Sequence, residues 1–181
     1  MSSSIRKQKG IFIFTGSAKV SGMRELVHYY FAYGSNMNPE RVKKRQMDFH
    51  SARGGRLRHY QLAFNKRSVK YPGAASANVV PIPGAITEGV AYRLAAPEQI
   101  EMMDPFEGYP HRYNRLPLRI HLEGGDVDAW VYVANHEYVT EGLNPARWYL
   151  EHLLAGREFL SRNYYEALSG TPCLPVSEEE P

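Results

Sequence analysis

Two short stretches carry residue types that could do chemistry, and the first is a Gly-Ser-Asn loop at residues 34–36. It directly follows the aromatic, strand-like run 29–33. Gly, Ser and Asn favour turn conformations, which leave backbone N–H groups free of a sheet ladder. Asn38 and Pro39 follow as a capping residue and a proline at a first helical position, which predicts a short helix over 39–45. N–H groups at a helix N-terminus attract anions, so the loop is a candidate site for a ligand carboxylate.

The second stretch holds two carboxylates, Asp104 and Glu107, just before Gly108. A carboxylate held in a pocket can take a proton from one group and return it to another. Pro105 should break a preceding helix, so that Glu107 projects from a tight turn. Taken singly, such a stretch is more often a surface carboxylate pair, and a Gly-Ser-Asn loop is more often an ordinary turn. Ser35 also lacks the Gly-x-Ser-x-Gly setting of a hydrolytic nucleophile.

Taken together, the motifs resemble one known family. The Tyr-Gly-Ser-Asn loop after an aromatic strand, the Asp-Pro-Phe-Glu-Gly stretch at 104–108 and the Pro-Ala-Arg-Trp-Tyr-Leu stretch at 145–150 resemble the γ-glutamylcyclotransferase-like (AIG2-like) family. The resemblance runs from about residue 29 to residue 168. The fourth loop position is Asn, whereas the glutathione-specific branch of that family usually carries Leu there. This difference points away from that branch.

The resemblance implies an intramolecular reaction, in which the α-amine of a γ-glutamyl group attacks its own γ-carbonyl. This closes 5-oxoproline and expels an amine or an amino acid. It also implies that Glu107 is the catalytic proton shuttle. Asp104, a like charge three residues earlier in the sequence, is expected to tune Glu107. The site residues that we expect to bind substrate are Tyr33, Gly34, Ser35 and Asn36. The aromatic residues Tyr109, Tyr113 and Tyr138 are candidates for the leaving-group side, with Arg112 for a substrate carboxylate, although core packing and solvated charge are the usual roles of such residues.

No cofactor or metal is expected. The seven histidines show no pair at a short ligand spacing. The alternative to an enzyme is a non-catalytic binding module that keeps the same fold and pocket, and such a module would not need Glu107. A third interpretation is nucleic-acid binding, but a net charge of +3 favours a mildly basic surface over a nucleic-acid groove, so we expect no nucleic-acid partner. The resemblance implies a small-molecule γ-glutamyl substrate instead.

The composition fits one soluble domain. The chain has 181 residues, of which 43% are apolar and 23% charged, enough for a single core without a stabilising cofactor. One cysteine, Cys173, allows no internal disulfide and is compatible with a reducing compartment. No apolar run approaches the 18 or so residues of a membrane span. We therefore expect a cytoplasmic protein without a membrane partner.

The residue pattern predicts three segments: an N-terminal extension over 1–22, a domain over 23–170 and a mobile tail over 171–181. A short strand at 11–14 is an alternative for the extension. Within the domain, alternating apolar residues predict the strands: 29–33, 56–65, 77–82, 88–94, 113–122 and 126–134. Caps and prolines predict the helices: 39–45, 97–103, 145–156 and 158–168, with a loop over 49–55. Closely spaced strands with late helices indicate an α+β domain, and the resemblance implies a small mixed or antiparallel β-barrel flanked by helices.

Overall fold

The computed structural model describes residues 26–174, so the predicted extension over 1–22 and its alternative strand at 11–14 lie outside the described residues. Most of the predicted tail, 175–181, also lies outside them. Five strands are described: β1 (Tyr29–Ala32), β2 (Phe49–Arg67), β3 (Ala75–Leu94), β4 (Tyr113–Leu122) and β5 (Gly125–Ala134). Four α-helices accompany them: α1 (Pro39–Lys44), α2 (Asp104–Glu107), α3 (Arg147–Leu154) and α4 (Arg162–Ser169). Short 3-10 helices are also present: Ser35–Met37, Pro97–Met102, His136–Tyr138 and Arg157–Phe159.

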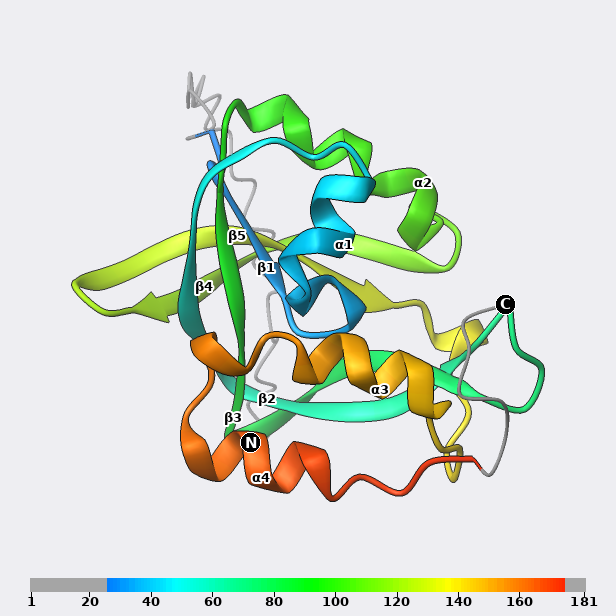
Figure 1. Ribbon diagram of the computed structural model, residues 1–181. Helices are drawn as coiled ribbons and strands as arrows, with labels where there is room; N and C mark the ends of the chain where they lie inside the picture. The colour runs from blue at the N-terminus through cyan, green and yellow to red at the C-terminus, as the bar shows by residue number, and fades with distance from the viewer. Residues whose placement is uncertain (1–25, 175–181) are drawn as a thin grey trace, which may run out of the picture.

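The strands close into a barrel in the order β1-β3-β2-β4-β5. Neighbouring strands are antiparallel except where β1 closes the barrel parallel to β5. Figure 1 shows α3 in front of the strands, with α4 beneath it and α2 at the upper right. The predicted fold class, an α+β barrel with flanking helices, is confirmed.

Strand β1 is buried on both faces and contributes to two hydrophobic cores. Phe31 points into the barrel interior, where it packs with residues such as Leu57 and Ile120. Tyr30 lies in a second core, between the barrel and the helices, with residues such as Leu150. Strands buried on both faces read as continuous apolar runs rather than alternating ones. This explains the aromatic run that precedes the Gly-Ser-Asn loop.

The prediction of a loop over 49–55 is wrong, because these residues form the start of β2. Gly54 and Gly55 suggested a loop, but they permit close packing instead. A Cβ at Gly54 would lie 2.5 Å from the carbonyl oxygen of Phe159, and one at Gly55 would lie 2.9 Å from a methyl carbon of Ile120. Glycine in a strand often marks such an approach.

The two strands expected over 77–82 and 88–94 are one strand, β3. Their predicted turn at Pro83 and Gly84 is an irregularity in the long β2–β3 hairpin, where the pairing register shifts between Arg58 and Tyr60. Gly84 has a positive φ of 83°, and its N–H donates to Nδ1 of His59 at 3.1 Å. A bulge of this kind bends a strand without ending it.

The two C-terminal helices begin later than expected. Residues 144–146 stay extended because Ala146 forms a β-bridge with Leu174, so α3 starts at Arg147. The helix predicted over 158–168 breaks at Leu160, which is extended. The side chain of Ser161 then accepts a hydrogen bond from the N–H of Tyr164 and caps α4.

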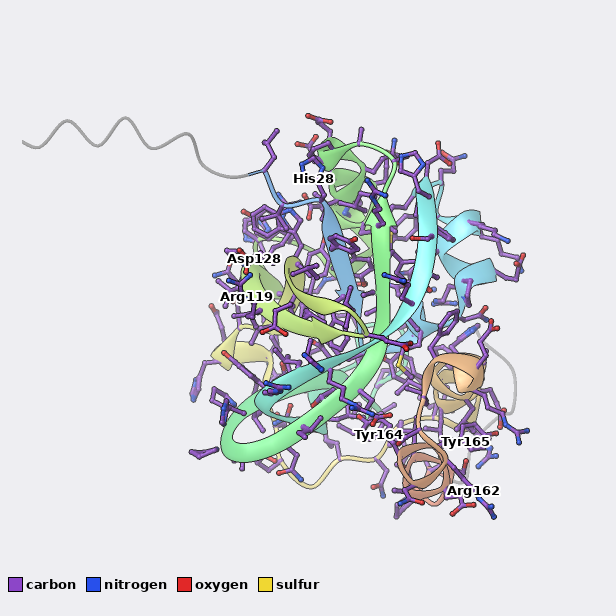
Figure 2. The ribbon with its side chains drawn as sticks, turned by 90° about the vertical axis from the view of Figure 1, so that its left-hand side faces the viewer. His28, Arg119, Asp128, Arg162, Tyr164 and Tyr165 are labelled. Carbon is purple, nitrogen blue, oxygen red and sulfur yellow. The ribbon has the colours of Figure 1, made fainter. Side chains whose placement is uncertain are left out.

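The β4–β5 hairpin matches the prediction closely. Its turn falls at Gly124 and Gly125, both with positive φ, as a tight hairpin turn requires. Arg119 and Asp128 face each other across it and form an ion pair at 3.3 Å. Figure 2 shows this pair on the hairpin, well separated from Tyr164 and its neighbours on α4.

Candidate functional site

The Gly-Ser-Asn loop leaves the end of β1 and turns at once into a 3-10 helix. The N–H of Met37 donates to the carbonyl oxygen of Gly34 at 2.9 Å, and the Asn38 side chain caps α1 by accepting from the N–H of Glu40 at 3.1 Å. The predicted capping residue is therefore confirmed. The loop is also buried, since Ser35 and Asn36 are largely shielded from solvent.

Asn36 holds the predicted catalytic carboxylate in place. Its side chain donates to Oε1 of Glu107 at 2.9 Å and to the hydroxyl of Tyr30 at 2.8 Å, while its Oδ1 accepts from Arg45 at 2.9 Å. The hydroxyl of Tyr92 donates to its backbone carbonyl at 2.7 Å. The Asn36 side chain is 3% exposed and fully engaged, so the structure makes it a positioning residue for Glu107.

Glu107 is the last residue of α2. The helix ends there because Gly108 adopts the left-handed conformation, with φ of 69°. A Cβ at Gly108 would lie 1.9 Å from Nε of Arg112. Arg45 approaches Oε1 of Glu107 at 3.4 Å, so both donors use the same oxygen. Among the described residues, none donates to Oε2, which leaves that oxygen available to exchange a proton with a ligand.

Asp104 is bound to other partners than Glu107. Both of its oxygens accept from Nη1 of Arg115, at 3.0 and 3.1 Å, and the hydroxyl of Tyr132 donates to it at 2.6 Å. The positive charge of Arg115 opposes the like-charge influence on Glu107 that the sequence suggested. The pKa of Tyr132 is raised, first by burial and then by its hydrogen bond to Asp104. Asp104 thus anchors α2 to β4 and β5.

A small inner cavity of about 30 Å³ lies against the Gly-Ser-Asn loop. Its lining is dominated by tyrosines around one carboxylate, and the complete set is as follows: Tyr30, Phe31, Tyr33, Gly34, Ser35, Asn36, Ala77, Glu107, Tyr113, Tyr132 and Tyr149. Every candidate substrate-binding residue therefore lies in this lining, as does Tyr113.

Three tyrosine hydroxyls of this lining are bonded to the backbone. Tyr33 donates to the carbonyl of Tyr132, and Tyr113 donates to the carbonyl of Ala77 at 2.6 Å. The hydroxyl of Tyr149 accepts from the N–H of Ala77 at 2.9 Å. Burial is the main cause that raises the pKa of Tyr33, Tyr113 and Tyr149, and the charge of Glu107 raises each further. These hydroxyls stay protonated at neutral pH and keep the cavity wall rigid.

A larger outer cleft of about 250 Å³ lies beside the inner cavity and shares lining residues with it. Glu107 and Tyr113 line both spaces, so the carboxylate stands at the junction between them. Lys66 and Arg112 line the outer cleft, Arg112 as one of the sequence candidates. Tyr138 lines neither space. Its ring packs 5.9 Å from the Arg67 guanidinium, in a neighbouring hollow.

Sequence reasoning missed several residues of the site. Arg45 and Tyr132 carry no sequence signal of a role in the site, because nothing in the sequence links them to Glu107. Tyr149 lies within the Pro-Ala-Arg-Trp-Tyr-Leu stretch at 145–150, but nothing in the sequence assigns it an individual role. Lys66 did have a signal, since it continues the in-phase series of Leu62 and Phe64 along β2, which predicts an inward-facing side chain. Over residues 26–174, no group of three or more His, Cys, Asp or Glu side chains could hold a metal ion, and no helix there is long and apolar enough to cross a membrane.

Comparison with known proteins identifies the family to which the chain belongs. Residues 30–150 match the family described as gamma-glutamyl cyclotransferase, AIG2-like. The chain belongs to this family. A comparison with curated proteins finds no match.

Several solved structures share the fold of this family member. An uncharacterized protein from Homo sapiens has a TM-score of 0.73 at 22% identity, covering 86% of this chain and 94% of its own. A structure described as gamma-glutamyl cyclotransferase has a TM-score of 0.71 at 20% identity, covering 84% and 92%. YkqA from Bacillus subtilis has a TM-score of 0.68 at 23% identity, covering 80% of this chain and 55% of its own.

Proposed function

We propose that the protein is a γ-glutamylcyclotransferase that releases 5-oxoproline from a γ-glutamyl amide. The observation that carries this proposal is the position of Glu107. Its carboxylate lines both a small cavity and a larger cleft, and Oε1 is held by Asn36 and Arg45. In the proposal the γ-glutamyl head lies on the side of the Gly-Ser-Asn loop and the leaving group lies in the larger cleft, which puts the proton shuttle beside the bond that breaks.

In the proposed reaction, Oε2 of Glu107 takes a proton from the α-ammonium group of the substrate. The freed amine attacks the γ-carbonyl carbon, which forms the new C–N bond and places negative charge on the carbonyl oxygen. Glu107 then gives its proton to the departing nitrogen as the old C–N bond breaks and the carbonyl re-forms. It also takes the second proton that the ring nitrogen loses on becoming an amide, and passes that proton to the released amine or to solvent. The products are 5-oxoproline and a free amine, and the carboxylate is regenerated.

The surrounding residues serve this reaction without entering it. Backbone N–H groups of the Gly-Ser-Asn loop would stabilise the oxyanion, because preorganised donors act strongly in an enclosed site. Tyr33 and Tyr113 would wall the glutamyl head. The bond between Asn36 and Glu107 fixes the carboxylate, and Asp104 holds the short helix that carries it. No metal or cofactor enters any step.

A panel of γ-glutamyl amides tests this proposal, with 5-oxoproline detected by mass spectrometry. The panel should include γ-glutamyl amino acids and γ-glutamyl amines, since these differ in the leaving group alone. Release of 5-oxoproline from at least one member, at a rate proportional to enzyme concentration, is the expected result. Saturable binding of panel members without any 5-oxoproline would favour the non-catalytic binding module instead.

A further inference from the structure

The outer cleft is strongly cationic. Five basic side chains line it in the part of the chain that the structure describes, against a single carboxylate, Glu107. The five are the following: Arg41, Arg45, Lys66, Lys70 and Arg112. Arg45 is engaged by Asn36 and Glu107, and Arg41 contacts His152 at 3.0 Å. Lys66 and Arg112 line the same cleft, on the side where a leaving group would lie.

Lys66 is the most unusual member of this set. It lies near the end of β2 and is 4% exposed. Its ammonium group sits 5.3 Å over the ring of Tyr113. No carboxylate or carbonyl oxygen lies within hydrogen-bond distance of it among residues 26–174. A buried charge with no anion in hydrogen-bond contact is costly, so a ligand anion that bonds the ammonium group would lower this cost.

Arg112 places a second cation beside the first. Its Nη2 reaches the carbonyl oxygens of Pro105 and Phe106 only at 3.4 and 3.5 Å. Burial and then the charge of Arg112 lower the pKa of Lys66 to about 8, so the ammonium is still charged at neutral pH. Two cations held close together, one of them buried, are an arrangement that binds carboxylates.

We propose that Lys66 and Arg112 form a subsite for an anionic side group on the leaving amine. The substrates are then γ-glutamyl amides of acidic amino acids or acidic peptides. This inference rests on the proposed cyclisation, because that reaction places the leaving group in the outer cleft. A polyamine or any other cationic leaving group would meet like charge in the same space, and like-charge contacts discriminate strongly against a ligand.

Three substrates of similar size test the subsite: γ-glutamyl-glutamate, γ-glutamyl-glutamine and γ-glutamyl-lysine, all joined through the α-amine. They differ in side-chain charge from −1 through 0 to +1. We expect kcat/KM to fall about tenfold at each step, because a hydrogen bond to a charged group contributes about this much. Equal values for all three, or the reverse order, would overturn the proposal.

The variant Lys66→Met tests the residue itself, because Met keeps the length of the side chain and removes the charge. The ratio of kcat/KM between the glutamate and glutamine substrates should fall from about 10 to about 1. Lys43→Met is the matched control, since Lys43 is exposed on α1 and pairs with Glu40. It should keep the wild-type ratio. A second variant, Arg112→Gln, should also lower the ratio of kcat/KM between the glutamate and glutamine substrates. Thermal melting checks that each variant is folded.

Binding of unreactive analogues separates this inference from the proposed reaction. Glutaryl amides of the same three amino acids keep the carboxylate of the glutamyl head but lack the α-amine, so they cannot cyclise. Calorimetry should give the affinity order glutamate, glutamine, lysine. That order without any 5-oxoproline from the parent substrates would refute the reaction and keep the subsite. Affinities independent of charge would refute the subsite even if turnover occurs.

Discussion

Replacing Lys66 with Met should stabilise the fold, although it damages the proposed subsite. Lys66 is buried with a full charge and, within residues 26–174, without an anion in hydrogen-bond contact. Its environment consists of the Tyr113 ring with Arg112 and Arg67, and Glu107 is the favourable charge near it. Burial is the largest cause that lowers its pKa from 10.5 to about 8. A Met side chain fits the same space and carries no charge to desolvate.

The magnitude follows from linkage between protonation and folding. Each tenfold change in a protonation equilibrium corresponds to about 1.4 kcal/mol, so the lowered pKa of Lys66 means that its charge costs the fold about 3 kcal/mol at pH 7. The Met variant also loses the cation–π contact with the Tyr113 ring, and this loss offsets up to about 2 kcal/mol of the gain. We therefore expect Lys66→Met to raise the free energy of unfolding by about 1 to 3 kcal/mol at pH 7.

The sign of the pH dependence is a sharper test. Below about pH 8, Lys66 is charged in both states, and the cost is fully present. As the pH rises from about 8 toward 10.5, the folded chain releases this proton before the unfolded chain does, so the cost fades. Urea titrations of wild type and Lys66→Met at pH 7 and pH 10 should show the advantage of the variant shrinking. A destabilised variant, or an advantage independent of pH, would refute the reasoning.

Three further substitutions test other parts of the account. In Gly34→Ala, the new Cβ meets two atoms at 3.1 and 3.2 Å in the inner cavity, so kcat/KM should fall about tenfold in steady-state assays, and chemical denaturation should show a loss of about 1 kcal/mol. Asp104→Asn removes the charge that Arg115 pairs with, and chemical denaturation should show a loss of about 3 kcal/mol with kcat nearly unchanged. Gly89→Ala would place a Cβ 2.3 Å from a carbonyl oxygen of β1 and should cost about 3 kcal/mol by the same measurement. A change of less than about 0.5 kcal/mol there would contradict the close approach of β1 and β3.

Local sequence signals predicted the elements that depend on short-range chemistry. The β4–β5 hairpin followed from alternation and paired glycines, and the start of α1 followed from Asn38 and Pro39. The long β2–β3 hairpin did not follow, because Gly54 and Gly84 resemble turn residues locally. Only the packing of Gly54 against Phe159, or the irregular register at Gly84, shows why the strand continues. Tertiary contacts decide such positions, and a sequence read in isolation lacks them.

In the candidate site, too, local motifs identified some residues, whereas the roles of others depend on tertiary contacts. Glu107 and the Gly-Ser-Asn loop were found through their motifs, and the structure brings them together at 2.9 Å. The role given to Asp104 was drawn from its distance along the chain alone, whereas in space its charge is paired with Arg115. The position of Tyr138 beside Arg67 could not be predicted, since it depends on how the loop after β5 packs.

The most direct test of the central claim is the turnover of Glu107→Gln, measured with binding of a glutaryl amide in the same protein. Gln keeps the oxygen that accepts from Asn36 but cannot shuttle a proton at pH 7. We expect kcat for 5-oxoproline release to fall about 100-fold to 10,000-fold, the range for losing a general acid–base group. The affinity for the glutaryl amide should stay within about threefold, because the unreactive ligand needs no proton transfer. Turnover close to that of the wild type would contradict the assignment of Glu107 as the proton shuttle.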